Sequence, residues 1–345
     1  MQETKFIKPT TKVYRKQVME GYSIPAFIKN GHHYYFVDLD VYEDGRVECW
    51  NFEDFEHFVK DVRNGWVTTA MSDKEQIAFH GLGHWVIEDG NWLFDKETFI
   101  SYVQSLIKEL NPKQENIYKY SEKTIGGIKV GENGRGTVYK EREKYPNDIY
   151  SEKVDGKSIN LFYRISDQYY LAKVNIFTDG NIQLSRLENP VDLTFSEFEK
   201  AIQEKALLTE LPADTTVFVH GLGNFRLAKA IYAINIEAKL LEVKDILRTL
   251  NGEPTSIDIC REAYKNHVAD PTTANRDKLK ISYENVPDHD KMFVGDQDTK
   301  DIKIRMILYG EQEIEKWSHY QVAKSRGEQL PTIEIINPKD ENKNE

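Results

Sequence analysis

Two long segments of this chain repeat one pattern of residues, and this repeat constrains the fold more than any other feature of the sequence. In the first half of each segment, matching residues keep one constant separation: Gly21 and Gly156, Tyr34 and Tyr169, Asp44 and Asp179. In the second half they keep a slightly larger one: Phe55 and Phe195, His80 and His220, Leu110 and Leu250. An insertion of five residues near Arg186 to Asp192 accounts for the change. Chance does not keep register over this length, so we predict two copies of one domain, at 21–112 and 156–252.

Each copy reads as an α+β unit in which three strands precede a helix, a short strand pair and a closing helix. In the first copy, β-branched and aromatic runs predict strands at 24–29 and 34–42, and a third strand at 46–50 follows Asp44-Gly45. Apolar residues then recur at helical spacing over 55–62 and again over 98–110. Strands joined by short turns, together with amphipathic helices, predict a small antiparallel sheet with helices on one face.

The rest of the chain divides into four segments of different character. Residues 1–20 form an N-terminal arm, and 113–155 form a glycine-rich linker or flexible hairpin. Residues 253–336 predict a small helical C-terminal domain, in which Thr255 caps the first helix, Thr273 caps the second, and Gly310 interrupts a later one. The last residues, 337–345, are charged and are expected to be disordered.

The composition excludes several classes of protein. The 345 residues are 39% hydrophobic and 30% charged, which is too apolar for a disordered chain and too charged for a membrane protein. The two cysteines, Cys49 and Cys260, exclude a disulfide framework and a four-thiolate zinc site. Neither a signal peptide nor a spanning segment is recognisable, so we expect a soluble cytoplasmic protein. The formal charge of -11 argues against a nucleic-acid partner, which needs a basic face.

The segment His-Gly-Leu-Gly occurs in each copy, at 80–83 and 220–223, and it supplies the first candidates for chemistry. A histidine at the end of an apolar strand can act as a base or a metal ligand, so His80 and His220 are the candidate catalytic residues. The competing interpretation is a tight turn between two strands, because glycine readily adopts the positive φ that such turns need. We favour the turn, and Asn224 at the position equivalent to His84 argues against a shared metal site.

Three further patterns resemble known sites but lack a necessary part. The glycine-rich stretch 131–136 has the spacing of a phosphate-binding loop without its lysine. Asp296 and Asp298 match the first ligands of an EF-hand loop whose glutamate is missing, and a helix cap by Asp298 or its neighbour explains them better. Glu315 and His319 lie one helical turn apart, which indicates a surface contact. We therefore predict no metal site and no cofactor.

Aromatic residues make up 12% of the chain and are its main surplus. Most tryptophans, Trp50 among them, are expected in the core. Two tyrosine pairs lie in predicted strands at equivalent positions of the copies, and successive strand residues point to opposite faces. One tyrosine of each pair should therefore be exposed. We predict a binding surface from Tyr34, Tyr35, Tyr169 and Tyr170.

These features favour a non-enzymatic cytoplasmic protein that binds or regulates another protein. Two related surfaces in one chain raise the effective concentration for one partner, and an acidic protein favours a basic partner. A bacterial immunity or defence accessory factor is one role of this kind. The sequence leaves the oligomeric state open.

The alternative is a metal-dependent hydrolase or nuclease that uses His80 or His220. In that hypothesis the histidine works with acidic neighbours such as Asp38 and Asp40. It requires a pocket that joins these residues, and it fails if both histidines face a closed turn.

Overall fold

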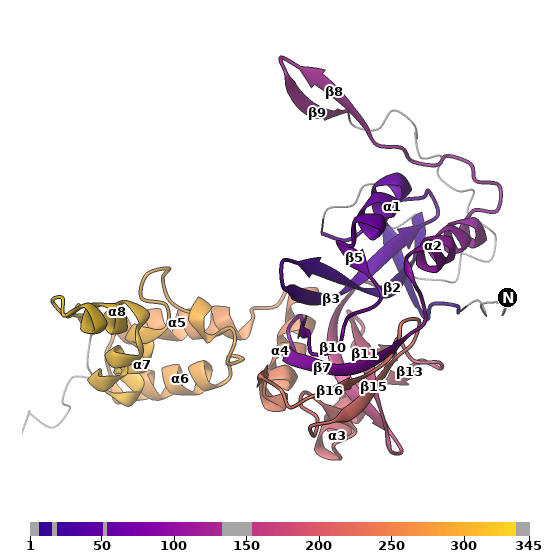
Figure 1. The fold of residues 1–345 in the computed structure, drawn as a ribbon. Coiled ribbons are helices and arrows are strands. Elements are labelled where there is room, and N and C mark those ends of the chain that lie inside the picture. Colours follow the sequence, from indigo (N-terminus) through magenta and orange to yellow (C-terminus); the bar gives the residue numbers. More distant parts are fainter. Residues whose placement is uncertain (1–6, 16–18, 51–53, 133–153, 336–345) are drawn as a thin grey trace, which may run out of the picture. The chain divides into compact units, whose positions relative to one another are not determined.

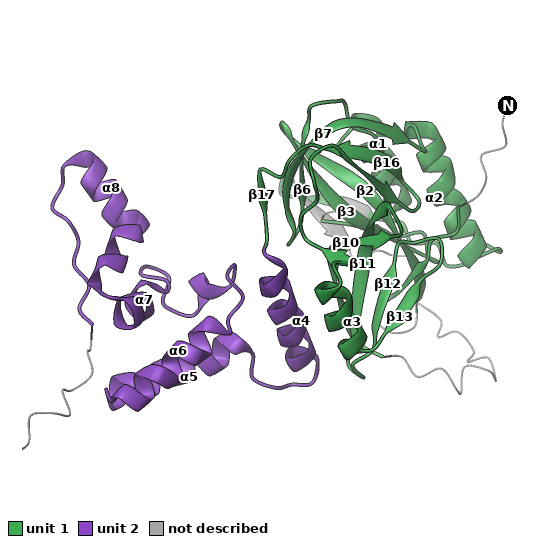
Figure 2. Cartoon of the chain, turned by 90° about the horizontal axis from the view of Figure 1, so that it is seen from below, with its two compact units in different colours: residues 1–234 green, residues 235–345 purple. Residues whose placement is uncertain are grey.

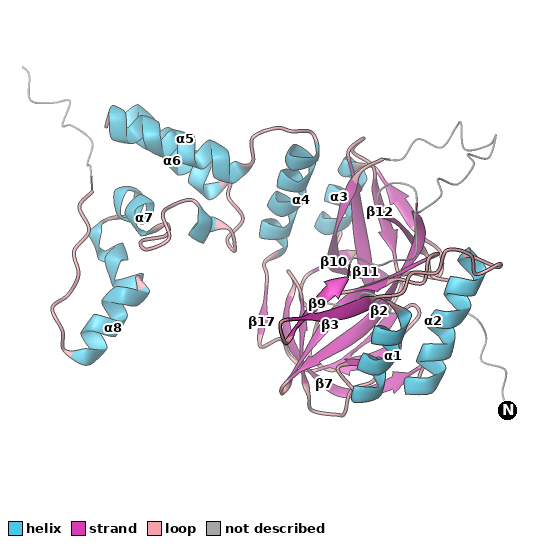
Figure 3. Cartoon of the chain, turned by 90° about the horizontal axis from the view of Figure 1, so that it is seen from above, coloured by secondary structure: helices cyan, strands magenta, loops and turns pink. Residues whose placement is uncertain are grey.

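The computed structural model describes residues 7–15, 19–50, 54–132 and 154–335. The chain forms two compact units, residues 1–234 and 235–345, which have different colours in Figure 2. Strands dominate the first unit, and the described part of the second is helical (Figure 3). The predicted α+β class with a helical C-terminal part is confirmed.

The first repeat contains the predicted elements and two additional strands. One of them, β1, comes from the N-terminal arm and pairs antiparallel with β2, and the other, β5, is a short strand after the first helix that also pairs with β2. The elements are β1 (Thr11–Arg15), β2 (Met19–Asn30), β3 (His33–Tyr42), β4 (Val47–Glu48), α1 (Phe55–Asn64), β5 (Val67–Thr68), β6 (Gln76–Phe79), β7 (Gly83–Trp92) and α2 (Lys96–Leu110). Strands β2 and β3 form a hairpin around Gly31, whose φ of 63° suits the turn.

Local signals fix the ends of both helices. The Asp54 side chain accepts the backbone N–H of His57 at the start of α1, and Gly65 ends this helix with a φ of 79°. A capping box between Asp95 and Thr98 starts α2. These residues set where the amphipathic helices begin and end. The apolar face of each helix then decides which surface it packs against.

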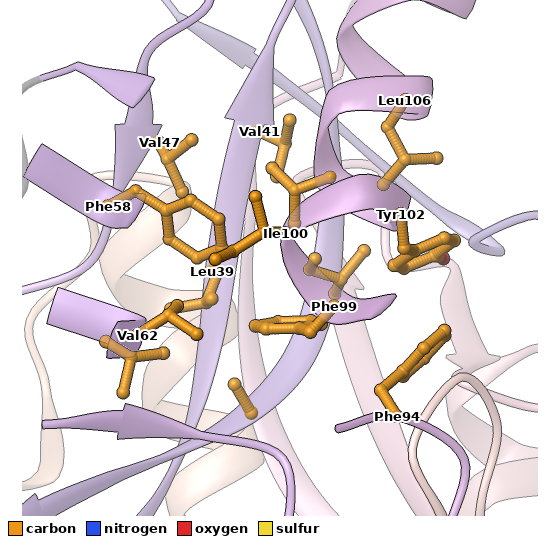
Figure 4. Packing of buried hydrophobic residues seen from close by; sticks show 14 of the residues in the cluster. Leu39, Val41, Val47, Phe58, Val62, Phe94, Phe99, Ile100, Tyr102 and Leu106 are labelled. Atoms are coloured by element: carbon orange, nitrogen blue, oxygen red, sulfur yellow. The ribbon is translucent and has the colours of Figure 1, made fainter. Parts of the chain in front are cut away.

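Helices α1 and α2 cover one face of strands β2 and β3 (Figure 1). Figure 4 shows the core between them, where Leu39 of β3 lies among side chains from both helices. The rings of Phe58 and Phe99 are 5.6 Å apart and join α1 to α2. Burial of such side chains contributes about 1.5–3 kcal/mol each relative to exposure, so this core fixes the faces of the first repeat.

The second repeat follows the same order. Its elements are β10 (Gly156–Ile165), β11 (Gln168–Phe177), β12 (Ile182–Ser185), β13 (Val191–Leu193), α3 (Phe195–Gln203), β14 (Leu207–Leu208), β15 (Thr215–Val219), β16 (Gly223–Leu227), β17 (Tyr232–Ala233) and α4 (Ile236–Leu250). Helix α4 is the sequence equivalent of α2, with Leu250 matching Leu110, and it belongs to the second compact unit.

The sheet is mixed, which corrects the prediction of an antiparallel sheet. Most neighbouring strands are antiparallel, but β3 pairs parallel with β6, and β11 pairs parallel with β15. In each repeat the chain between these strands passes through a helix, and such a crossover lets the second strand run in the same direction as the first.

Between the repeats, part of the predicted linker is a two-stranded hairpin. Strands β8 (Ser121–Ile125) and β9 (Ile128–Glu132) pair with each other around Gly126 and Gly127, apart from the main sheet. Residues 133–153, which include part of the glycine-rich stretch, lie outside the described ranges.

The second unit continues after α4 with short helices. They are α5 (Ser256–Ala269), α6 (Thr273–Glu284), η2 (Lys291–Phe293), α7 (Ile302–Tyr309), η3 (Glu311–Lys316) and α8 (Ser318–Arg326). The capping box of Thr255 with Asp258 is confirmed, and Gly310 interrupts the helices as predicted. The cap of α6 is Thr272, so the prediction of Thr273 was wrong by one residue. Apolar residues such as Cys260, Leu279 and Ile304 form the core of this unit.

Candidate functional site

The two repeats meet along strand β7, which pairs with β6 of its own repeat and with β16 and β17 of the other. At one end the Leu93 N–H donates to the Leu222 carbonyl at 3.0 Å. At the other end the Ile234 N–H donates to the Leu82 carbonyl at 2.9 Å. Leu82 and Leu222 are the leucines of the two His-Gly-Leu-Gly segments. The repeats therefore join through equivalent elements, as the subunits of an isologous dimer do.

Glycine geometry explains most of the His-Gly-Leu-Gly pattern. Gly81 and Gly221 have φ angles of 65° and 82°, so the predicted turns are confirmed. Gly83 and Gly223 serve the contact between repeats. A Cβ atom at Gly83 would lie 2.2 Å from the Tyr232 carbonyl oxygen, and one at Gly223 would lie 2.2 Å from that of Asn91. Only glycine allows these backbones to approach so closely.

The structure separates the two candidate catalytic histidines. His220 lies beside the N-terminal segment, with its Nε2 atom 3.1 Å from the Lys8 carbonyl oxygen. His80 is exposed and lines a pocket that residues of both repeats form. Its position is consistent with the pocket that the hydrolase hypothesis requires, while His220 is not among the residues that line it.

This inter-repeat pocket has a volume of about 550 Å³. Asp38, Asp40, Glu48, Trp50 and His80 line it from the first repeat, and residues 158–160 of β10 line it from the second. Its polar lining is rich in carboxylates, and Trp50 adds a large aromatic surface.

An ion-pair network between the repeats borders the pocket. The Asp38 carboxylate lies 2.6 Å from Nη2 of Arg186 and 3.3 Å from Nζ of Lys173. Lys173 also donates to the Ser23 hydroxyl at 2.9 Å. Burial opposes ionisation of Asp38, but the charges of Arg186 and Lys173 hold its pKa below the usual value. The first repeat thus supplies the anion and the second repeat both cations.

Arg186 is held on several sides. Its Nη1 donates to the Asn160 side-chain oxygen at 2.9 Å, and its guanidinium lies 4.7 Å from the centre of the Phe36 ring. Its backbone N–H donates to the Thr10 hydroxyl at 3.0 Å. Only 3% of its side chain is exposed. The insertion that distinguishes the second repeat thus begins at a buried cation that connects three segments.

Two neighbouring groups in the pocket have raised pKa values. Burial raises the pKa of the Asp40 carboxyl to about 6, although Lys173 and Ser23 favour its charged form. Its Oδ1 atom has no hydrogen-bond partner among the described residues. Burial and the charges of Asp38 and Asp40 raise the pKa of the Cys49 thiol to about 12. Cys49 is therefore a thiol at neutral pH and a poor nucleophile.

Trp50 is 60% exposed, which corrects its expected place in the core. Its ring lies 5.4 Å from that of Tyr35, so the side chain has a packed edge and a solvent-facing surface. The predicted tyrosine surface differs from expectation: Tyr34 is buried, while Tyr35, Tyr169 and Tyr170 are half-buried. Aromatic exposure in this region is therefore concentrated in Trp50.

The duplicated part of the chain matches a sequence family. A family described as Domain of unknown function (DUF7638) matches residues 9–114 and 144–254, with one segment for each repeat. The chain belongs to the DUF7638 family. Residues 255–333 match a second family, described as Domain of unknown function (DUF7639). No curated protein and no solved structure matches the chain.

The other candidate sites are explained by local contacts. Asp296 accepts the backbone N–H of Thr299 at 2.6 Å, which lowers its pKa to about 2, and neither Asp298 nor Thr299 caps α7. Glu315 lies 3.8 Å from Lys324, and the ring of His319 lies 4.9 Å from that of Trp317, tilted by 40°. The described ranges contain no group of three or more His, Cys, Asp or Glu residues suited to a metal ion. Nor does any helix in these ranges have the length and apolar character needed to cross a membrane.

Sequence reasoning missed four site residues: Glu48, Trp50, Lys173 and Arg186. One usable signal existed, because Asp38 and Lys173 occupy equivalent positions of the two repeats, at the same separation as Gly21 and Gly156. Opposite charges at equivalent positions of two otherwise apolar strands indicate that these two positions meet in the contact between the repeats. No comparable signal marks Arg186, which lies in the insertion.

Proposed function

We propose that this DUF7638 chain is a non-enzymatic protein that binds or regulates a basic protein partner through the inter-repeat pocket. The observation that carries the proposal is the combination of carboxylates and an exposed Trp50 in one pocket. Tryptophan is enriched among the residues that dominate binding energy at protein interfaces. The formal charge of -11 adds long-range attraction for a basic surface.

The proposed setting is the bacterial cytoplasm, and a role as an immunity or defence accessory factor fits it. Both cysteines are free thiols, as a reducing compartment would keep them. The proposal does not include a nucleic-acid or membrane partner, because its recognition chemistry is acidic and both of those surfaces attract basic proteins.

A pull-down from native lysate tests this proposal. Tagged full-length protein is incubated at low and at high salt, and both proteins and nucleic acids in the eluate are identified. We expect one stoichiometric basic protein at low salt and much less of it at high salt, because salt screens exposed charges. An eluate without any stoichiometric protein would contradict the proposal.

A pair of variants makes the test specific to the pocket. The double variant Asp40→Asn/Glu48→Gln removes two pocket carboxylates and should abolish capture. The control Asp73→Asn/Glu210→Gln removes two exposed carboxylates outside the pocket lining and changes net charge equally. Equal loss in both doubles would show that overall charge, and not the pocket, recruits the partner.

A second candidate function is the metal-dependent hydrolase or nuclease, and one observation favours it. His80, Asp38 and Asp40 line the same pocket. The ion pairs of Asp38 with Arg186 and Lys173 count against a metal there, since they already neutralise that carboxylate. Metal analysis of the purified protein and hydrolysis assays with added Mg²⁺, Mn²⁺ or Zn²⁺ test this candidate. Activity that disappears in His80→Ala would favour it over the binding function.

A further inference from the structure

We infer that the inter-repeat pocket recognises the guanidinium group of an arginine side chain, with Trp50 as the stacking surface and Asp40 and Glu48 as the charge partners. This inference rests on the proposed function and names the group of the partner that enters the pocket.

Two carboxylates face each other at the pocket. Asp40 and Glu48 are directly opposite in the register of β3 and β4, and both line the pocket. Like charges at such positions destabilise a sheet. Burial is the main cause of the raised pKa of Asp40, and the charge of Glu48 adds to it. A cation between them would offset this repulsion.

Two described cations beside the pocket are engaged with a third carboxylate. Arg186 and Lys173 both contact Asp38, and only 3% and 10% of their side chains are exposed. Arg186 is also bound to Asn160. Oδ1 of Asp40 is buried and has no hydrogen-bond partner within the described part of the chain. A cation that enters the pocket would supply a counter-charge to this carboxylate.

The pocket also selects the shape of that cation. Trp50 is 60% exposed and lines the pocket, and its ring is supported by Tyr35. A guanidinium is planar, stacks on aromatic faces and donates along two parallel directions to carboxylates. An ammonium is a compact, strongly hydrated charge that uses such a flat surface less well. The volume of about 550 Å³ leaves room for a side chain and its flanking backbone.

Short peptides test the inference on the full-length chain. Three peptides of one sequence carry arginine, lysine or citrulline at the central position, and binding is measured by NMR titration of the labelled protein. We expect the arginine peptide to bind at least fivefold more tightly than the lysine peptide. Citrulline has nearly the same shape without the charge, and its peptide should bind at least tenfold more weakly than the arginine peptide. Equal binding of all three, or no binding by the arginine peptide, would overturn the inference.

Variants assign the effect to the named residues. Trp50→Ala should weaken the arginine peptide at least fivefold, while Trp50→Phe, which keeps an aromatic face, should retain most of the affinity. Asp40→Asn/Glu48→Gln should weaken it at least tenfold, and Asp73→Asn/Glu210→Gln should not change it. Circular dichroism establishes that each variant is folded. Affinity that is unchanged in both Trp50→Ala and the pocket double would place the peptide elsewhere and overturn the inference.

The outcomes separate this inference from the proposed function. Binding of the arginine peptide without any captured protein would support the guanidinium site and remove the protein partner. A captured protein whose binding is unaffected by Asp40→Asn/Glu48→Gln would support the partner and remove the guanidinium site.

Discussion

The two repeats share their order of elements but differ at the positions that surround the inter-repeat pocket. Three residues of the first repeat and their equivalents in the second show the difference: Asp40 and Asn175, Glu48 and Gln183, Trp50 and Ser185. In the second repeat the charges are replaced by amides of similar shape, and the tryptophan by a small hydroxyl. Ser185 is fully buried and bonds to the hydroxyl of Thr11 in β1 at 2.7 Å. The second repeat therefore closes the region that the first repeat leaves accessible.

A similar divergence holds the repeats together. Asp38 and Lys173 are equivalent residues, yet one is an anion and the other a cation. Two identical repeats would place two like charges at these positions, which is costly at a partly buried contact. Duplication thus explains the shared scaffold, and divergence explains both the ion pair and the single pocket. Substitutions at the contact between the repeats and at the inter-repeat pocket test this difference.

The largest effect is expected from alanine at the glycines that meet the opposite repeat. Gly223→Ala should lower the free energy of unfolding by about 3–5 kcal/mol, because strain at positive φ adds to overpacking. Its φ is 133° and its Cβ would lie 2.2 Å from the Asn91 carbonyl oxygen. Gly180→Ala is the control, since Gly180 has a φ of 84° but open space around it, and it should lose only about 1–2 kcal/mol. Urea denaturation measures both, and equal losses would show that the close approach is unimportant.

Removal of the anion at the contact should have the next largest effect. Asp38→Ala leaves Arg186 and Lys173 buried without their counter-charge and should cost about 3 kcal/mol. The double variant Asp38→Ala/Lys173→Met should lose less than the sum of the single losses, because each single variant leaves a charge unmatched. Urea denaturation at neutral pH measures this coupling. Because the folded-state pKa of Asp38 is lowered, its contribution is complete above its ordinary value of 3.8 and is lost as the pH falls through the folded-state pKa. Strictly additive losses would contradict the inter-repeat ion pair.

Neutralising Asp40 should stabilise the protein in a pH-dependent way. The folded-state pKa of about 6 lies above the ordinary value of 3.8, so the folded protein holds this proton more tightly than the unfolded chain does. Stability therefore falls as the pH rises from about 4 to about 6 and stays reduced above that range. Asp40→Asn should gain about 1–2 kcal/mol at pH 8 and almost nothing at pH 3.5. Asn175 already holds the amide at the equivalent position, so Asn175→Asp should show the reverse trend. Denaturation midpoints across pH 3.5–8 measure both variants, and a gain that does not depend on pH would contradict the assigned pKa.

The smallest effects are expected at Trp50 and Ser185, which occupy equivalent positions of the two repeats. Trp50 is exposed and Ser185 is buried. Ser185→Ala removes the acceptor of the Thr11 and Asn175 hydrogen bonds and should cost about 1 kcal/mol. Trp50→Ala removes a side chain that is mostly in solvent and should change stability by less than about 0.5 kcal/mol. Thermal unfolding measures both. A larger loss for Trp50→Ala than for Ser185→Ala would mean that Trp50 serves packing and not recognition.

Much of the fold could be predicted because its signals are local. The turn at Gly31, the helix stop at Gly65 and the cap at Thr255 each act within a few residues, and the duplication can be read by aligning the chain with itself. The parallel pairing of β3 with β6 was missed because it depends on how the chain returns after α1. Pairing between distant strands is a choice among many registers, which the pattern of one strand does not decide.

The candidate site was predicted only in part. Asp38 and Asp40 were considered with His80, and all three line the pocket. Trp50 was expected in the core, because an aromatic residue beside a strand is usually buried. In the structure β4 ends before Trp50, and β10 of the second repeat lines the same pocket, and neither feature can be read from residue types.

The sequence by itself determined that this chain contains a duplicated domain followed by a helical segment, because repeat spacing, apolar periodicity and capping residues can all be read from the order of the residues. Only the tertiary structure decided that Asp38 meets Lys173 and Arg186, that Gly83 and Gly223 lie against the opposite repeat, and that one of two equivalent regions remains accessible. The physical reason is the range of the interactions. Local conformational preferences depend on neighbouring residues, whereas burial and charge pairing depend on which distant surfaces meet.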